Sequence, residues 1–66
     1  MDFVEKAKTR LDHWMTHNTH HLEEYEIFAD HLEDAGKTES ARHVREMVDL
    51  SAKVNDCLKK AVQALD

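Results

Sequence analysis

Hydrophobic residues recur through the first half of the chain with the seven-residue period of packed α-helices. One heptad position holds Val4, Leu11, Asn18, Tyr25 and Leu32. A second position holds Ala7, Trp14, His21, Phe28 and Ala35. Further hydrophobic residues flank this stripe at Met15, Leu22 and Ala29. The spacing predicts one long helix over residues 3–35, with the aromatic residues of the stripe in a helix–helix core.

The second half of the chain carries a similar pattern. One position of the stripe holds Val44, Ser51, Leu58 and Leu65. The other is supplied by Met47 or Val48, by Val54, and by Ala61 or Val62. This pattern predicts a second helix over residues 39–65, packed along the first.

The expected helix ends follow from a few capping residues. The chain has no proline and one glycine, Gly36, which suits the residue that closes the first helix. Thr38 is expected to cap the second helix, and Asp2 with Glu5 three residues later fits a capping box at the start of the first. Residues 16–19 have poor helix propensity, so a break with Thr19 as a new cap is an alternative. Because the heptad continues without a phase change, one continuous helix is favoured.

These elements define an all-α fold, a two-helix antiparallel hairpin forming a single domain over residues 1–66. A chain this short builds a marginal core and usually needs a disulfide, a metal ion or a partner chain. A disulfide within the chain is excluded because Cys57 is the only cysteine. We therefore expect the hairpin to pair into a four-helix bundle as a homodimer, with a larger protein partner as a further option.

Charge and composition limit the classes of partner. The formal net charge is −5, and no basic stripe marks a nucleic-acid-binding surface. No stretch approaches the ~18 apolar residues of a membrane span, and the N-terminus lacks the apolar region of an export signal. A lone cysteine fits a reducing, cytoplasmic setting. Cys57 is expected to be a small buried residue near the helix–helix seam, with His17 as the histidine it would meet if it were a ligand.

Four of the six histidines lie between residues 13 and 21. Residues three or four apart are neighbours on a helix surface, and two imidazoles at that spacing can hold one metal ion. The predicted metal-binding ridge consists of His13, His17, His20, His21 and Glu24. Imidazole ligands suit divalent transition metals, here nickel, zinc or cobalt. One helix supplies only two or three ligands at once, so the symmetry mate would supply the rest.

A structural interpretation of the same residues stays open. His21 and Asn18 share one level of the predicted seam, and folding the hairpin brings this level to Ser51 and Asn55. A hydrogen-bonded polar layer there would fix register and oligomeric state. The protein would then be an adaptor that dimerises or binds another helical protein through its apolar stripe. A third interpretation is a pH-responsive assembly in which the histidines act as proton switches.

Two further features receive weaker interpretations. His31 and His43 fall near the same level of the hairpin, beside Glu39 and Glu46, and are expected to be surface histidines rather than a second ion site.

An enzyme is not expected. The run from His17 to His21 lacks the glutamate of HExxH, no histidine follows a glutamate by three residues, and no glycine-rich phosphate loop is present.

The run Trp14-Met15-Thr16-His17-Asn18-Thr19-His20-His21, followed by Glu23-Glu24-Tyr25, resembles a W-x2-HN-x2-H pattern that is followed by E-[YF]. Short histidine-rich helical-hairpin domains of prokaryotes share this pattern, and some accompany nickel or cobalt handling proteins. The resemblance covers nearly the whole chain, with a less specific second helix. It implies a metal-handling role and carries over Trp14, His17, Asn18, His20 and Tyr25. It implies no mechanism.

Overall fold

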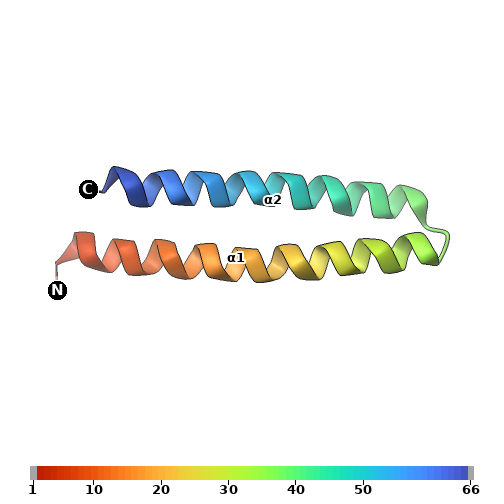
Figure 1. Ribbon diagram of the computed structural model, residues 1–66, viewed down its shortest axis with the longest axis horizontal. Helices are drawn as coiled ribbons and strands as arrows, with labels where there is room; N and C mark the ends of the chain where they lie inside the picture. Colours follow the sequence, from red (N-terminus) through yellow and green to blue (C-terminus); the bar gives the residue numbers. More distant parts are fainter. Residues whose placement is uncertain (1, 66) are drawn as a thin grey trace.

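Two long helices side by side make up the part of the chain that the computed structural model describes, residues 2–65. Helix α1 spans Phe3–Asp34 and helix α2 spans Thr38–Ala64. The helices run antiparallel, so both ends of the chain lie at the same end of the hairpin (Figure 1). The Cα trace measures 51 × 16 × 10 Å. The predicted all-α hairpin is therefore confirmed.

The first helix begins at the predicted cap and continues without a break. The Asp2 carboxylate accepts a hydrogen bond from the backbone N–H of Glu5 at 2.9 Å, which satisfies one of the free N–H groups of the first turn. Residues 16–19 are helical despite their low propensity. The Thr19 hydroxyl donates to the carbonyl of Met15 at 2.9 Å, so its hydrogen bond is made inside the helix and does not compete with it. The continuous helix is confirmed over the alternative with a break.

The connection between the helices is a Schellman turn closed by Gly36. The N–H of Lys37 donates to the carbonyl of Leu32 at 2.8 Å, and the N–H of Gly36 donates to that of Glu33 at 2.9 Å. Gly36 has a φ of +81°, the left-handed conformation that glycine adopts without a Cβ penalty. The predicted Thr38 cap is wrong. Lys37 is the cap residue and gives no side-chain hydrogen bond, while Thr38 is already helical.

The seam between the helices is rotated from the predicted one. In α1 the buried and half-buried residues are Ala7, Lys8, Leu11, Met15, Asn18, His21, Leu22, Tyr25, Ala29 and Leu32. In α2 and at its C-cap they are Ala41, Val44, Arg45, Val48, Ser51, Asn55, Leu58, Val62 and Leu65. Trp14 is 50% exposed and Phe28 is 56% exposed, so their prediction as core residues is wrong for the single hairpin. A lone partner helix covers only one edge of a wide apolar stripe, and these residues lie on the other edge.

One long face of the hairpin is polar and bridged by hydrogen bonds. The Arg45 guanidinium of α2 reaches across to the carboxylates of Glu33 at 3.1 Å and Asp30 at 3.0 Å on α1. Asn55 of α2 donates to the Thr19 hydroxyl at 2.9 Å on the same side. The polar side of the seam is therefore the side that carries Arg45 and Asn55 on α2 and Thr19, Asp30 and Glu33 on α1.

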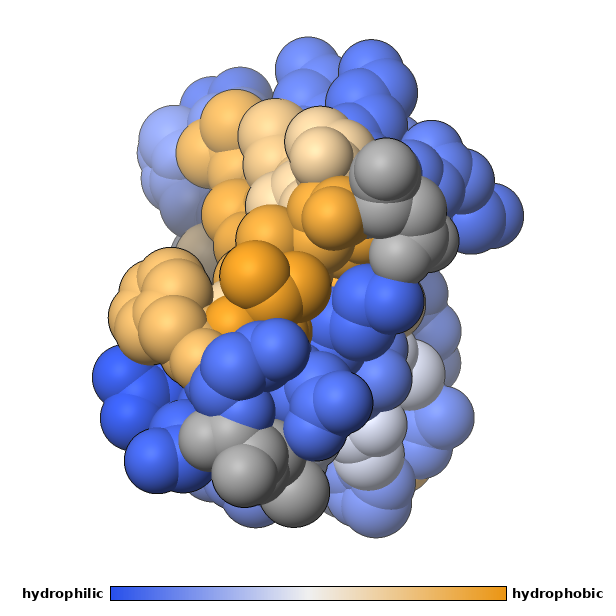
Figure 2. Space-filling model, turned by 90° about the vertical axis from the view of Figure 1, so that its left-hand side faces the viewer, coloured by the Kyte–Doolittle hydropathy of each residue, from blue (hydrophilic) through white to orange (hydrophobic). Residues whose placement is uncertain are grey.

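The opposite long face carries exposed hydrophobic residues from both helices. Heptad positions place them on the side of the seam away from Arg45, and they are Phe3, Trp14 and Phe28 of α1 and Met47, Leu50 and Val54 of α2. We call these six residues the apolar face. Seen from the end that holds the termini, hydrophobic side chains gather in one patch among hydrophilic ones (Figure 2).

The buried core of the single hairpin is small. Within residues 2–65 only Ala29 and Ala41 are fully buried, and both lie near the turn. Two alanines supply little of the burial that normally offsets the conformational entropy of folding. The hairpin therefore has a strong physical reason to cover its apolar face.

No helix within the described residues is long and apolar enough to cross a membrane.

Candidate functional site

A polar layer crosses the seam at the middle of the hairpin. The Asn18 side-chain amide donates to the backbone carbonyl of Ser51 at 2.8 Å and to the Asn55 Oδ1 at 3.0 Å. Asn55 in turn donates to the Thr19 hydroxyl. The predicted layer of Asn18, Ser51 and Asn55 is therefore present. Among the described residues, His21 makes no hydrogen bond to this layer and lies beside it, toward the apolar face.

The histidines of α1 form a row along the edge of the apolar face. The ring centroids of His13 and His17 are 5.9 Å apart, and those of His17 and His21 are 4.7 Å apart. The row ends on Tyr25, whose ring is 5.9 Å from that of His21 with 12° between the planes. The four-residue spacing brings these rings together, as expected from helix geometry. Along the helix the row begins next to Trp14 and ends three residues before Phe28.

The rings of His17 and His21 are stacked rather than directed at one point, whereas those of His13 and His17 are tilted by 56°. The planes of His17 and His21 differ by only 27°. The lone pair of an imidazole nitrogen lies in the ring plane, so two nearly parallel rings direct their lone pairs past each other. Within the described residues, no group of three or more histidine, cysteine or acidic side chains is arranged to hold a metal ion. Ion binding by this pair would require side-chain rotation, and both residues are exposed enough to rotate.

The other two residues of the predicted ridge differ in their surroundings. The Glu24 carboxylate lies 3.7 Å from Nδ1 of His21, an i,i+3 contact between side chains 70% and 43% exposed. It is placed to orient that imidazole or to ligate an ion beside it. His20 is exposed, and no ring contact joins it to the other histidines within the described residues. The row thus consists of His13, His17 and His21, with Glu24 beside it.

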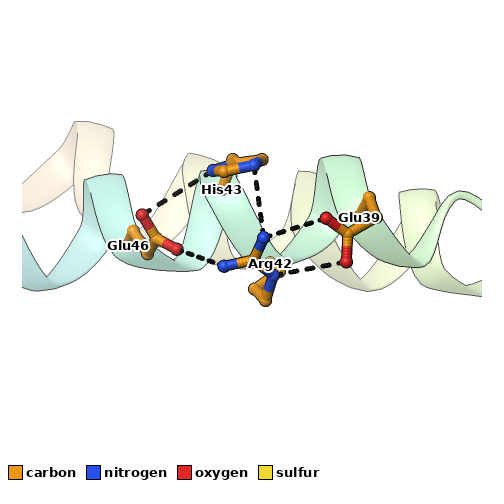
Figure 3. Close-up of polar contacts among 4 residues, drawn as sticks. All are labelled: Glu39, Arg42, His43 and Glu46. Atoms are coloured by element: carbon orange, nitrogen blue, oxygen red, sulfur yellow. Dashed lines mark hydrogen bonds and ion pairs between the residues drawn. The ribbon is translucent and has the colours of Figure 1, made fainter.

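His43, near the turn, belongs to a separate polar cluster on α2 (Figure 3). Arg42 holds the carboxylates of Glu39 at 2.9 Å and Glu46 at 2.8 Å, and His43 lies 3.7 Å from the second of these. The hydrogen bond from Arg42 lowers the pKa of Glu39 and raises that of Arg42. With its carboxylates held by arginine, this cluster fits the surface interpretation of His43. His31 makes no contact with His43 in the described part of the chain.

Cys57 is exposed, which corrects its predicted burial. The seam of α2 uses Ser51, Asn55 and Leu58, and Cys57 falls on the flank of the helix that borders the apolar face. A residue only one position from a seam residue is turned about 100° around the helix. That rotation is enough to move the thiol out of the seam.

The sequence did not single out a shallow cleft on α1. It has a volume of about 310 Å³ and is lined by Phe3, Lys6, Ala7, Arg10, Leu11 and Trp14. Aromatic walls and two cationic side chains give it an amphipathic character. Ala7 and Trp14, which line the cleft, share one heptad position, and that position predicts core residues rather than the walls of a cleft. The cleft is the N-terminal part of the apolar face.

Fold and site together define a small helical hairpin with an imidazole row beside an uncovered apolar face. The chain belongs to the family described as "Domain of unknown function (DUF8180)", whose model matches residues 7–65. That match covers both helices, including every residue of the row. Neither the curated proteins nor the solved structures give a significant match.

Proposed function

We propose that this protein is a small, non-enzymatic binder of a divalent transition-metal ion, acting in storage, sensing or delivery. The observation that carries the proposal is the row of three imidazoles, in which each ring adjoins the next at 5.9 and 4.7 Å. Imidazole is a common ligand of nickel, zinc and cobalt. The net charge of −5 favours the approach of cations. The resemblance to hairpins that accompany nickel or cobalt handling agrees with this role.

His17 and His21 are the proposed anchor pair. Their i,i+4 spacing allows both rings to rotate toward one ion on the same face of α1. His13 and Glu24 flank the pair on either side, whereas His20 contributes less because its side chain lies off the row. A closed zinc site takes four ligands, so one helix leaves the coordination incomplete. Water, a partner chain or a larger client protein would complete it, and an incomplete site suits an ion that is passed on.

The test is calorimetric titration of metal-stripped protein with Ni²⁺ and with Zn²⁺ at neutral pH. The matched control is the His17→Ala/His21→Ala variant, with helicity checked by circular dichroism. We expect micromolar or tighter binding at a fixed ratio of ion to chain in the wild type, and its loss in the variant. Weak, non-saturating heat in both proteins would reject the metal-binding function.

A second candidate function rests on a different observation. The apolar face exposes Trp14, Phe28 and Leu50 by half or more, and it extends over residues 3–28 of α1 and 47–54 of α2. Large exposed apolar patches mark interaction surfaces. The protein would then be a cytoplasmic homodimer or an adaptor for another helical protein. Stability that depends on protein concentration and does not respond to metal would favour this candidate over the first.

A further inference from the structure

We infer that a second copy of this chain covers the apolar face, and that His13 of the partner subunit completes the ion site begun by His17 and His21. The inference deepens the proposed metal-binding function and rests on it for the ion. The dimer itself rests on separate observations. Those observations are the size of the face, the charges along it and the residues that a twofold axis would pair.

The size of the face fits a stable dimer. The Cα trace of the hairpin extends over 51 by 16 Å, so one of its long sides can supply the roughly 800 Å² that one partner contributes to a specific interface. The hairpin buries only Ala29 and Ala41 fully, so covering this face would supply most of the missing core. Two stacked hairpins form a four-helix bundle, a common way to bury such stripes.

The charges on the edge of α1 select the arrangement of the two copies. Arg10 lies seven residues before His17 and Glu24 lies seven residues after it, all three at the same heptad position. When α1 packs antiparallel on its own copy with the twofold axis at His17, Arg10 comes level with Glu24 of the partner subunit. Two such opposite-charge pairs form in each dimer, which favours this register.

Residues nearer the seam fit the same axis. Ala7 comes within one residue of level with Phe28 of the partner subunit, which sets a small residue against a large one. Trp14 comes within one residue of level with the partner's His21, allowing aromatic contact. The 56% exposed ring of Phe28 therefore gains a place to pack.

Helix α2 is compatible with the same axis. The bonds from Asn18 to Ser51 and Asn55 place the level of His17 near Val54, which is 50% exposed on the apolar face. Around Val54, Met47 comes level with Ala61 of the partner subunit, again a large residue against a small one. The alternative axis, parallel to the helices, would set Glu24 against the partner's Met47 and bury a carboxylate on an apolar side chain.

The same axis brings a third imidazole to the anchor pair. His13 lies four residues before His17, and His21 lies four residues after it. His13 of the partner subunit therefore comes level with His21, beside the pair formed by His17 and His21. Each dimer contains two such sets of three imidazoles, one on each side of the axis. Three imidazoles and a water make a four-coordinate site with one exchangeable position.

The dimer is tested first, in metal-free buffer with chelator, by sedimentation equilibrium. Arg10→Glu and Glu24→Arg each place like charges together twice in the dimer, so we expect each to weaken self-association by about tenfold. The double variant Arg10→Glu/Glu24→Arg restores the opposite-charge pairs and is expected to return toward the wild-type constant. A double variant as weak as the two single variants combined, or single variants that leave association unchanged, would overturn the arrangement.

The shared site is tested by complementation with Ni²⁺ as the probe. His13→Ala lacks the third ligand, and His17→Ala/His21→Ala lacks the pair, so we expect neither to bind Ni²⁺ like the wild type. Refolded together, they form mixed dimers in which one complete site survives, and we expect tight binding to reappear at up to one ion per mixed dimer. Wild-type affinity in His13→Ala alone, or a mixture no better than its components, would overturn the shared site. If the wild type itself binds no ion, the proposed function fails with it, while the charge-swap result still decides the dimer.

Discussion

The Asn18 amide donates a 3.0 Å hydrogen bond to the side-chain oxygen of Asn55, joining the two helices at their middle. The same amide group donates to the carbonyl of Ser51, so one side chain ties down two levels of α2. Each of these residues is partly buried. A polar pair inside an otherwise apolar seam costs burial energy but penalises every register in which its partners are missing. The Asn18 layer therefore sets which residues of α1 and α2 lie opposite each other.

Asn18→Ala is predicted to destabilise the hairpin by about 1–3 kcal/mol, because Asn55 and the Ser51 carbonyl lose their donor in a partly buried site. The double variant Asn18→Leu/Asn55→Leu is expected to recover most of that loss while accepting more than one oligomeric state. Urea unfolding followed by circular dichroism, with sedimentation for the oligomeric state, checks both. Equal, additive losses in the single and double variants would contradict the role of the pair.

Gly36→Ala is predicted to destabilise the protein by about 1–2 kcal/mol, because a left-handed φ costs an L-residue that much. The backbone alone is responsible, since a Cβ at Gly36 would meet no atom within 4 Å. Gly36→Asn is the matched control and is expected to lose less, because asparagine tolerates this conformation. Thermal unfolding of the three proteins compares them. An alanine variant as stable as the wild type would show that the turn does not require the positive φ.

The cluster on α2 gives a pH-dependent prediction. The hydrogen bond from Arg42 holds the pKa of Glu39 below its ordinary value. A carboxyl group with a lowered folded-state pKa adds stability above its unfolded pKa, and this contribution is lost as the pH falls through the folded value. Arg42→Ala is therefore expected to raise the pKa of Glu39 toward its ordinary value, as measured by NMR titration of the carboxyl carbon. An unchanged Glu39 titration would contradict the pairing. The contact is exposed, so the change in stability is expected to be small.

The proposed twofold axis also predicts a cross-link. In a Cys57→Ser background, Val54→Cys places a thiol next to its own copy at the axis, so mild oxidation is expected to give a covalent dimer. Lys53→Cys in the same background is the control, because residue 53 faces outward on α2. Non-reducing gel electrophoresis compares the rates. Equal cross-linking of the two variants would mean that random collision, not a defined interface, joins the chains.

The sequence predicted most of the fold because local rules decide it. Gly36 set the turn, Asp2 set the first cap, and the unbroken heptad through Asn18 predicted a helix that local propensity alone would interrupt. The polar layer followed from folding the pattern about Gly36. These features depend on neighbours along one helix or on a simple antiparallel match, which the order of residues specifies.

The sequence did not predict which residues of the wide apolar stripe a single partner helix buries. Trp14 and Phe28 carry the heptad signal of core residues, yet a single hairpin leaves them half exposed. The burial expected for Cys57 is also wrong, because Cys57 lies one position from a seam residue and is therefore turned out of the seam. The sequence predicts the histidine ridge as a set of ligands, but His17 and His21 stack, because spacing along a helix fixes which rings are neighbours and not how they rotate. Whether these residues become core and ligands depends on a second chain.

Native mass spectrometry of the wild-type protein, loaded with Ni²⁺ and freed of excess ion, tests the central claim most directly. The account predicts a species of two chains carrying two ions, and a species of two chains without ions when the protein is stripped. The His13→Ala protein is expected to remain a two-chain species with its ions lost. A single chain that holds an ion by itself, or a two-chain species that takes up none, would contradict the account.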